Sequence, residues 1–238
     1  MSDSLPTHCP DGRVCQFSQQ IDDLNQEVDR LSQLVSVDPL TQLFNYRHFS
    51  QTLAQEIERS QRTLQATSLI MIDIDHFKKV NDQWGHEKGN QALKLIAKCI
   101  IDNIRKLDIA CRYGGEEFAI ILPSSDIVTS ARVAERIRQS IEQTPLTVAL
   151  ENNSLEKNTL ENSTTQHIPL TASAGLSSYN GNNDPASCNI IEAADEQLYL
   201  AKQQGRNRVC YAVIEEVEHQ QVSTEEKDAL ATLFDDRL

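Results

Sequence analysis

Two apolar runs separated by a Gly-Gly-Glu-Glu sequence place the strongest constraint on the fold of this 238-residue chain. The runs are residues 109–111 and 118–122, and Arg112-Tyr113-Gly114-Gly115-Glu116-Glu117 lies between them. β-type residues around two adjacent glycines predict a β-hairpin, because glycine tolerates the positive φ angles of a tight turn. Paired acids at such a tip can hold a divalent cation, and a cation there implies a phosphate substrate. A solvated tip with two surface acids is the alternative that these residues leave open.

A second pair of acids ends an apolar run about 40 residues upstream. Residues 68–75 read Ser-Leu-Ile-Met-Ile-Asp-Ile-Asp, which has the length of a buried strand. Asp73 and Asp75 are two positions apart, so on a strand they project from the same face. Because an unpaired buried carboxylate is costly, these acids and the hairpin together predict a hard-cation site with oxygen ligands. The alternative is that Asp75, or less readily Asp73, caps a helix beginning near His76.

The charge of the chain limits its partners. The net charge of −13 argues against nucleic-acid binding, which needs basic surface. From residue 215 to the end there are eight acids and two bases, a net of −6, so the remaining chain is mildly acidic and can bind an anionic nucleotide.

No apolar segment has the length of a membrane span and no signal-peptide pattern begins the chain, so we expect a cytoplasmic protein without a membrane partner. Six scattered cysteines favour reduced core residues over a disulfide framework.

The N-terminal region divides into two segments. Residues 17–36 are predicted to form a helical stalk, because apolar residues alternate at spacings of four and three: Phe17, Ile21, Leu24, Val28, Leu31 and Val35. Such a narrow seam favours pairing with a second copy, and packing on the chain's own domain is the alternative. Residues 1–16 contain His8, Cys9 and Cys15, which could bind a metal or sense redox state. Because their spacing matches no standard metal site, we favour the alternative that the segment is purely structural or unstructured.

Residues 37–214 alternate irregularly between helix and strand patterns, which predicts a layered α+β domain with helices covering a sheet. We expect helices over residues 46–62, 90–106, 127–143 and 189–204, and further strands over residues 146–150, 170–177 and 208–214. Residues 151–167 are rich in Asn, Ser, Thr and Glu and predict a flexible insertion. The acidic tail, residues 215–238, has one helix-like apolar pattern: Ala229, Leu230, Leu233 and Phe234.

Taken in order, six motifs resemble the GGDEF family, the diguanylate cyclases, over roughly residues 37–214. They are residues 38–45 (Asp-Pro-Leu-Thr-Gln-Leu-Phe-Asn), 73–82, 85–86 (Gly-His), 112–118, 171–175 and 201–207. The resemblance implies a palm-like fold shared with class III nucleotide cyclases and polymerases, built on a mainly antiparallel sheet. It also implies condensation of two GTP into cyclic di-GMP and two pyrophosphates, across a homodimer of facing half-sites with two Mg²⁺ or Mn²⁺ ions each.

The same resemblance implies roles for individual residues. Asp73, Glu116 and the Ile74 carbonyl look like the metal ligands; the catalytic set is Asp73, Glu116 and Glu117, of which Glu117 resembles a proton acceptor for the 3′-hydroxyl. Asp75 would lie in the layer behind the ligands. The terminal phosphates would be held by Lys202 and Arg206, helped by backbone N–H groups of His76, Phe77 and Lys78. The alternative for Lys202 is charge complementarity with a helix C-terminus.

Asn81 and Asn90 resemble the guanine-reading residues of the family. At Asn90 the chain departs from the family pattern. An aspartate usually stands where this sequence has Asn90, and it can accept hydrogen bonds from both guanine N1–H and the 2-amino group. Asn90 offers one acceptor and one donor, so we expect GTP affinity to fall about tenfold to a hundredfold, with relaxed base choice and some mixed cyclic GMP–AMP. Tyr46 is another departure, because the family commonly has an arginine there.

Arg105 and Asp108 lie just before the hairpin and match the RxxD inhibitory site of the family. A guanidinium can bind a phosphate or a guanine edge bidentately, so the match predicts feedback inhibition by cyclic di-GMP. A surface salt bridge at a helix end is the alternative for these two residues. At the level of the whole protein, the alternative is a catalytically weak receptor that binds cyclic di-GMP at Arg105 and Asp108.

Overall fold

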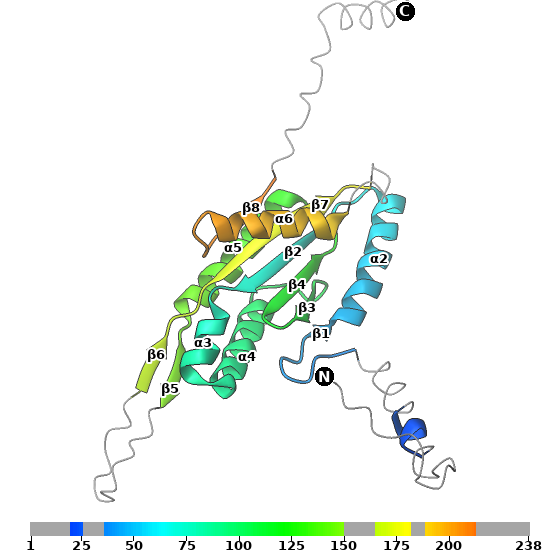
Figure 1. Ribbon diagram of the computed structural model, residues 1–238. Coiled ribbons are helices and arrows are strands. Elements are labelled where there is room, and N and C mark those ends of the chain that lie inside the picture. The colour runs from blue at the N-terminus through cyan, green and yellow to red at the C-terminus, as the bar shows by residue number, and fades with distance from the viewer. Residues whose placement is uncertain (1–19, 26–35, 150–164, 182–188, 213–238) are drawn as a thin grey trace, which may run out of the picture.

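The computed structural model describes residues 20–25, 36–149, 165–181 and 189–212. A six-stranded sheet with the order β1-β3-β4-β2-β7-β8 forms its centre (Figure 1). These strands are β1 (Phe44–Asn45), β2 (Thr67–Ile74), β3 (Ile109–Gly114), β4 (Glu117–Leu122), β7 (Ala172–Tyr179) and β8 (Val209–Tyr211). The four inner strands pair antiparallel, and β1 and β8 add in parallel at the two edges. The fold is therefore the expected palm-like α+β arrangement around a mainly antiparallel sheet.

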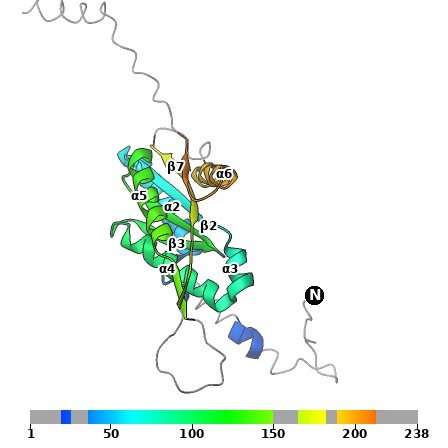
Figure 2. The same cartoon turned by 90° about the vertical axis from the view of Figure 1, so that its left-hand side faces the viewer.

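Helices cover both faces of this sheet. The helices α2 (Tyr46–Thr63) and α6 (Ile190–Gln203) pack on one face, and α3 (Phe77–Trp84), α4 (His86–Asp102) and α5 (Ile127–Gln143) pack on the other. Figure 2 shows α5 and α6 on opposite sides of β7. The alternation of β2 explains the two layers, because Ile70 and Ile72 join the core under α4 and α5 while Leu69 and Met71 join the core under α2 and α6.

Polar caps determine where three of the helices begin. Asn45 accepts a hydrogen bond from the His48 amide before α2, and Asp126 accepts one from the Thr129 amide at 2.7 Å before α5. Asn189 caps α6 in the same way. A capping oxygen satisfies one of the amides that a helix start leaves without a partner. These three helices agree with the predicted ranges to within one residue at each end.

Several other predicted boundaries were wrong. The helix expected over residues 90–106 is α4, which begins four residues earlier and ends at Asp102, because Gly85 with φ of +80° separates it from α3. The strands expected over residues 170–177 and 208–214 are the shifted β7 and the shorter β8. Residues 165–167, expected within a flexible insertion, belong to β6 (Thr165–Ile168), which pairs with β5 (Leu146–Ala149) in a separate two-stranded ribbon (Figure 1).

The N-terminal predictions are only partly covered. Residues 20–25 are helical with Ile21 and Leu24 exposed, while the rest of the seam, His8, Cys9, Cys15 and the acidic tail beyond residue 212 lie outside the described residues.

Cys99 and Cys111 are buried free thiols, as expected for core cysteines. Burial raises the pKa of Cys111 to about 12, so this thiol stays protonated. None of the helices in the described ranges has the length and apolar character needed to cross a membrane.

Candidate active site

The sheet register brings two acids opposite each other. Asp73, next to last in β2, pairs with Glu117 of β4 on one side and with Ser173 of β7 on the other. Directly paired residues of an antiparallel ladder project from the same face with their Cβ atoms about 4.5–5.5 Å apart. Asp73 follows Leu69 and Met71 in the alternation, so both acids lie on the face covered by α6. A slip of one residue in β4 would turn Glu117 to the opposite face.

The hairpin tip differs from its predicted form in one respect. Gly114 still belongs to β3 and pairs with Glu117, while Gly115, with φ of +48°, and Glu116 make the turn. Glu117 is therefore the acid opposite Asp73, and Glu116, the expected metal ligand, lies one residue further out. The Glu116 carbonyl accepts a 3.4 Å hydrogen bond from the Ile74 amide. A Cβ added at either glycine would meet no atom within 4 Å, so the tip has open space around it.

Lys202 supplies the positive charge between these elements. It stands in the last turn of α6, and its Nζ lies 2.8 Å from Asp73 Oδ2. The residue therefore does more than complement a helix C-terminus, which was the alternative for it. The pKa of Glu117 is raised, first by burial and then by the charge of Asp73, with Lys202 acting in the opposite direction. Asp195 of α6 also raises the pKa of Glu117, and no sequence pattern pointed to this residue.

The donor set suits a hard divalent cation. Burial and the nearby Asp73 carboxylate together raise the pKa of Glu117, and a bound cation would favour its ionised form. Glu116 in the turn and the Ile74 carbonyl at the end of β2 are the adjacent oxygen donors, and oxygen ligands are what Mg²⁺ and Mn²⁺ prefer. Within the described ranges no three His, Cys, Asp or Glu side chains form a ready-made metal cluster. Backbone and substrate oxygens would have to complete the coordination.

The start of α3 adjoins the acids. His76 adopts φ of +58° as the N-cap residue, and among the described residues no side chain caps this helix. The predicted alternative that Asp75 or Asp73 caps it is wrong, because Asp75 is buried and accepts from Thr171 Oγ1 at 2.8 Å and Ser173 Oγ at 2.7 Å. The uncapped first-turn amides of Phe77 and Lys78 suit an anionic group.

The two predicted base-reading asparagines lie on adjacent helices. Asn81 is on α3 and Asn90 is exposed on α4, one residue beyond the buried Gly89. A Cβ placed on Gly89 would lie 1.9 Å from Asn81 Oδ1, so the Asn81 side chain reaches the turn of α4 that carries Asn90. The Asn81 amide thus lies against the residue that precedes Asn90.

Arg112 ties the hairpin tip to the N-terminal turn, a contact that sequence reasoning missed. Its Nε and Nη2 donate to the Gly115 carbonyl at 3.0 and 2.8 Å, and its Nη1 lies 3.3 Å from Asp38 Oδ2. Asp38 also accepts from the Thr41 amide at 2.8 Å and hydroxyl at 2.7 Å. Burial opposes ionisation of Asp38, but the Thr41 hydrogen bonds and the Arg112 charge outweigh it and lower the pKa.

Arg105 and Asp108 form a turn between α4 and β3, well away from the hairpin tip. Asp108 Oδ2 accepts from the Arg105 amide at 2.7 Å, so the predicted alternative of a salt bridge between their side chains is not what joins them. Burial raises the pKa of Asp108, although Arg105 and Arg136 of α5 counteract it. Arg136, which the sequence did not reveal, also donates to the Asn103 carbonyl.

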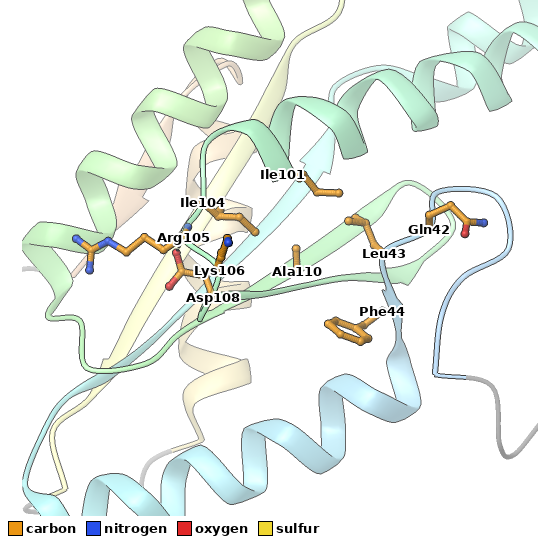
Figure 3. A pocket seen from close by; sticks show the side chains of 9 residues that line it. All are labelled: Gln42, Leu43, Phe44, Ile101, Ile104, Arg105, Lys106, Asp108 and Ala110. Atoms are coloured by element: carbon orange, nitrogen blue, oxygen red, sulfur yellow. Dashed lines mark hydrogen bonds between the residues drawn. The ribbon is translucent and has the colours of Figure 1, made fainter.

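A cavity of about 260 Å³ lies beside this turn. Its wall is mostly apolar and includes Leu43, Phe44, Ile101, Ile104 and Ala110. Figure 3 shows the Arg105 guanidinium extending away from this apolar wall. Arg105 and Lys106 are exposed and Asp108 is half-buried, so a large anionic ligand could reach the two cations.

The comparisons with known proteins agree with this geometry. The profile of the family described as "Diguanylate cyclase, GGDEF domain" matches residues 35–208. The chain belongs to the GGDEF family.

Named relatives show how far the likeness extends. The diguanylate cyclase DosC of Escherichia coli K12 is 37% identical over 196 residues, covering 82% of this chain and 39% of DosC. The response regulator PleD of Caulobacter vibrioides NA1000 / CB15N is 35% identical over 194 residues, covering 82% of this chain and 40% of PleD. This chain thus spans about two fifths of the length of both relatives.

One solved structure covers the same region. The crystal structure of the coiled coil and GGDEF domain of DgcB from Caulobacter crescentus, in complex with c-di-GMP, matches with a TM-score of 0.63 and 29% identity. The match covers 82% of this chain and 95% of that one.

Proposed function

We propose that this chain is a diguanylate cyclase that condenses two GTP into cyclic di-GMP with release of two pyrophosphates. The observation that carries the proposal is the opposition of Asp73 and Glu117 across the β2–β4 ladder, beside an open hairpin tip and the Lys202 ammonium. Family membership and the names of the relatives support it.

Each domain holds one half-site, and two domains of a homodimer face each other. Glu117 accepts the proton of the 3′-hydroxyl, a task that a carboxylate with a raised pKa performs better than an ordinary one. Lys202 and Arg206 bind the terminal phosphates, together with the first-turn amides of α3. Two Mg²⁺ or Mn²⁺ ions, when bound, stabilise the developing charge and orient the attacking and leaving oxygens. Asp73, Glu116 and the Ile74 carbonyl would hold them, with Glu117 directly opposite Asp73.

The test incubates purified protein with Mg²⁺ and GTP and identifies the product by mass spectrometry. Cyclic di-GMP from wild type, and none from Asp73→Asn or Glu117→Gln, is expected. Manganese binding followed by electron paramagnetic resonance separates the two tip acids, because Glu116→Gln should release the metal and Glu117→Gln should retain most of it. A protein that binds cyclic di-GMP but forms no product would be the receptor instead.

A mixed product is the second candidate, favoured by Asn90 alone. The Asn90 amide presents a donor and an acceptor, which suit the Watson–Crick edge of adenine as well as part of that of guanine. With equimolar GTP and ATP we expect some cyclic GMP–AMP, and Asn90→Asp should return the product to cyclic di-GMP. Cyclic di-GMP alone from the wild-type protein would rule out relaxed base choice.

Product inhibition and dimerisation complete the proposal. Arg105 and Asp108 bind cyclic di-GMP, so Arg105→Ala should abolish the early plateau of progress curves, while the neighbouring exposed Lys106→Ala should keep it. The stalk seam joins two copies, and the exposed Ile21 and Leu24 on a helical segment support this pairing. Analytical ultracentrifugation of Leu24→Asp should then show more monomer than wild type.

A further inference from the structure

The loop that carries Arg206 has a backbone that its residues do not favour. It follows α6 and consists of Gly205, Arg206 and Asn207, with φ angles of +114°, +64° and +46°. Left-handed backbone is unfavourable for residues other than glycine, although asparagine tolerates it better than most. Arg206 is exposed, so packing of its own side chain does not hold it in place. The Arg206 backbone amide donates to the Ala201 carbonyl at 3.0 Å, and Arg208 Nε donates to the Arg206 carbonyl at 3.2 Å. The contacts of the neighbouring Asn207 add a second set of restraints on the loop.

One contact comes from the sheet. The backbone N–H of Asn207 donates to Asp75 Oδ2 at 3.0 Å, and Asp75 is only 6% exposed. The carboxylate also accepts from the hydroxyls of Thr171 and Ser173, as described above. Hydrogen bonds to a buried carboxylate are strong and geometrically restrictive. Asp75 thus joins the Arg206 loop to the end of β2, two residues from Asp73.

The other contacts come from α5. Asn207 Oδ1 accepts from Arg138 Nη1 at 2.7 Å, and Asn207 Nδ2 donates to Glu142 Oε1 at 2.8 Å. Arg138 is itself held by Glu135 Oε1 and Glu142 Oε2, each at 2.8 Å, and its side chain is 13% exposed. The side chain of Asn207 is therefore held by Arg138, which two carboxylates fix in place, and by the more exposed Glu142.

We propose that Asn207 and Arg138 are positioning residues that pre-orient Arg206 for the terminal phosphates of the nucleotide. Neither residue touches the nucleotide; Arg138 acts through Asn207, and Asn207 acts through the loop. The inference rests on the proposed role of Arg206. A cation that is already oriented loses less conformational freedom on binding, so the benefit appears as affinity for the triphosphate and not for the base.

Two variants test this without touching Arg206. Asn207→Gly permits the positive φ and keeps the backbone N–H to Asp75 but removes both side-chain contacts. Arg138→Met removes the guanidinium and keeps a long apolar stem. Arg132→Met is the matched control, because Arg132 is exposed on the same helix and, in the described part of the chain, forms no ion pair. Thermal unfolding of each variant accompanies the binding measurements.

Calorimetry on the full chain would compare GMP with a non-hydrolysable GTP analogue, both with Mg²⁺. We expect Asn207→Gly and Arg138→Met to weaken the analogue about three- to tenfold and to change GMP binding less than about twofold. The KM for GTP should rise with little change in kcat. The control should alter neither ligand. A purely structural role would instead weaken both ligands together.

Arg206→Ala distinguishes the proposed role of Arg206 from the proposed role of Asn207 and Arg138. If this variant keeps the affinity for the triphosphate analogue, the proposed role of Arg206 fails and its positioning fails with it. If Arg206→Ala weakens the analogue but Asn207→Gly and Arg138→Met bind it like wild type, only the positioning proposal is overturned. The double variant Arg206→Ala/Asn207→Gly should lose no more affinity than Arg206→Ala alone, and additive losses would also overturn it. Should Arg138→Met fail to fold, Asn207→Gly decides.

Discussion

Removing the Arg112 guanidinium should loosen the active-site hairpin and destabilise the domain together. One side chain joins the tip carbonyl of Gly115 to Asp38, where the N-terminal region enters the fold. The Arg112 and Asp38 side chains are 19% and 17% exposed, so their interaction is only partly screened by water. Arg112→Met keeps the aliphatic stem and deletes every charged contact.

The size of the loss can be estimated from these contacts. A hydrogen bond from a charged donor contributes about 1.5–3 kcal/mol, but Nε and Nη2 share one acceptor and the ion pair is half-screened. We therefore expect a total loss of about 2–3 kcal/mol, which lowers the melting temperature by about 4–12 °C for a domain of this size. Arg62→Met is the control, because Arg62 lies 4.0 Å from Glu58 with both side chains about 70% exposed. It should cost less than about 0.5 kcal/mol.

Circular dichroism on heating gives the stability, and hydrogen exchange at residues 113–117 gives the mobility of the tip. The pH dependence supplies a further check. Asp38 has a lowered pKa in the folded state, so its contribution is present above the unfolded pKa and is lost as pH falls through the folded one. The difference between wild type and Arg112→Met should thus shrink below about pH 4. Equal melting temperatures for Arg112→Met and Arg62→Met at neutral pH would refute the reasoning.

Three further outcomes are expected. Glu117→Gln should abolish cyclisation yet raise the melting temperature of the metal-free protein at pH 7.5 by about 1–3 °C. The reason is that a carboxyl group with a raised pKa contributes stability below its unfolded pKa, and this stability is lost as pH rises through its folded pKa. A lower melting temperature would contradict this. Gly175→Ala should destabilise the domain by about 1–3 kcal/mol in chemical unfolding, since the added Cβ would lie 2.1 Å from the Leu198 amide nitrogen of α6. Gly89→Ala should raise the KM for GTP about tenfold by displacing the Asn81 amide, and an unchanged KM would exclude that amide from nucleotide binding.

Much of the central architecture follows from local pattern. The apolar run before Asp73, the adjacent glycines of the hairpin and the apolar patterns of α2, α5 and α6 were sufficient to predict those elements. The break between α3 and α4 was not, because the apolar spacing of α4 is strongest only from Leu93 onward. The residues 103–106 continue that spacing but are held in a turn by Asp108, a contact that propensity cannot reveal.

The site shows a similar division. Asp73, Lys202 and the tip acids could be predicted because their types and order are distinctive, whereas their geometry depends on register. The family resemblance predicts Asp73 and Glu116 as metal ligands, and the β2–β4 pairing adds that Glu117 is the acid directly opposite Asp73. Asp75 was expected behind the metal ligands, and its hydrogen-bond partners, which lie about 100 residues or more away along the chain, could not be predicted. Contacts between such distant segments leave no local periodicity to read.

The position of β2 in the sheet has a consequence for how the protein fails on heating. All of β2 is paired with β7, and six of its residues are also paired with β4, from Ser68 to Asp73. Amides in such a strand exchange only through the largest openings of a domain, whereas a hairpin tip with open space around it can open by itself. The strand β2, which carries Asp73, should thus stay folded at temperatures at which the hairpin tip is already disordered. Thermal inactivation would then precede unfolding and reverse on cooling.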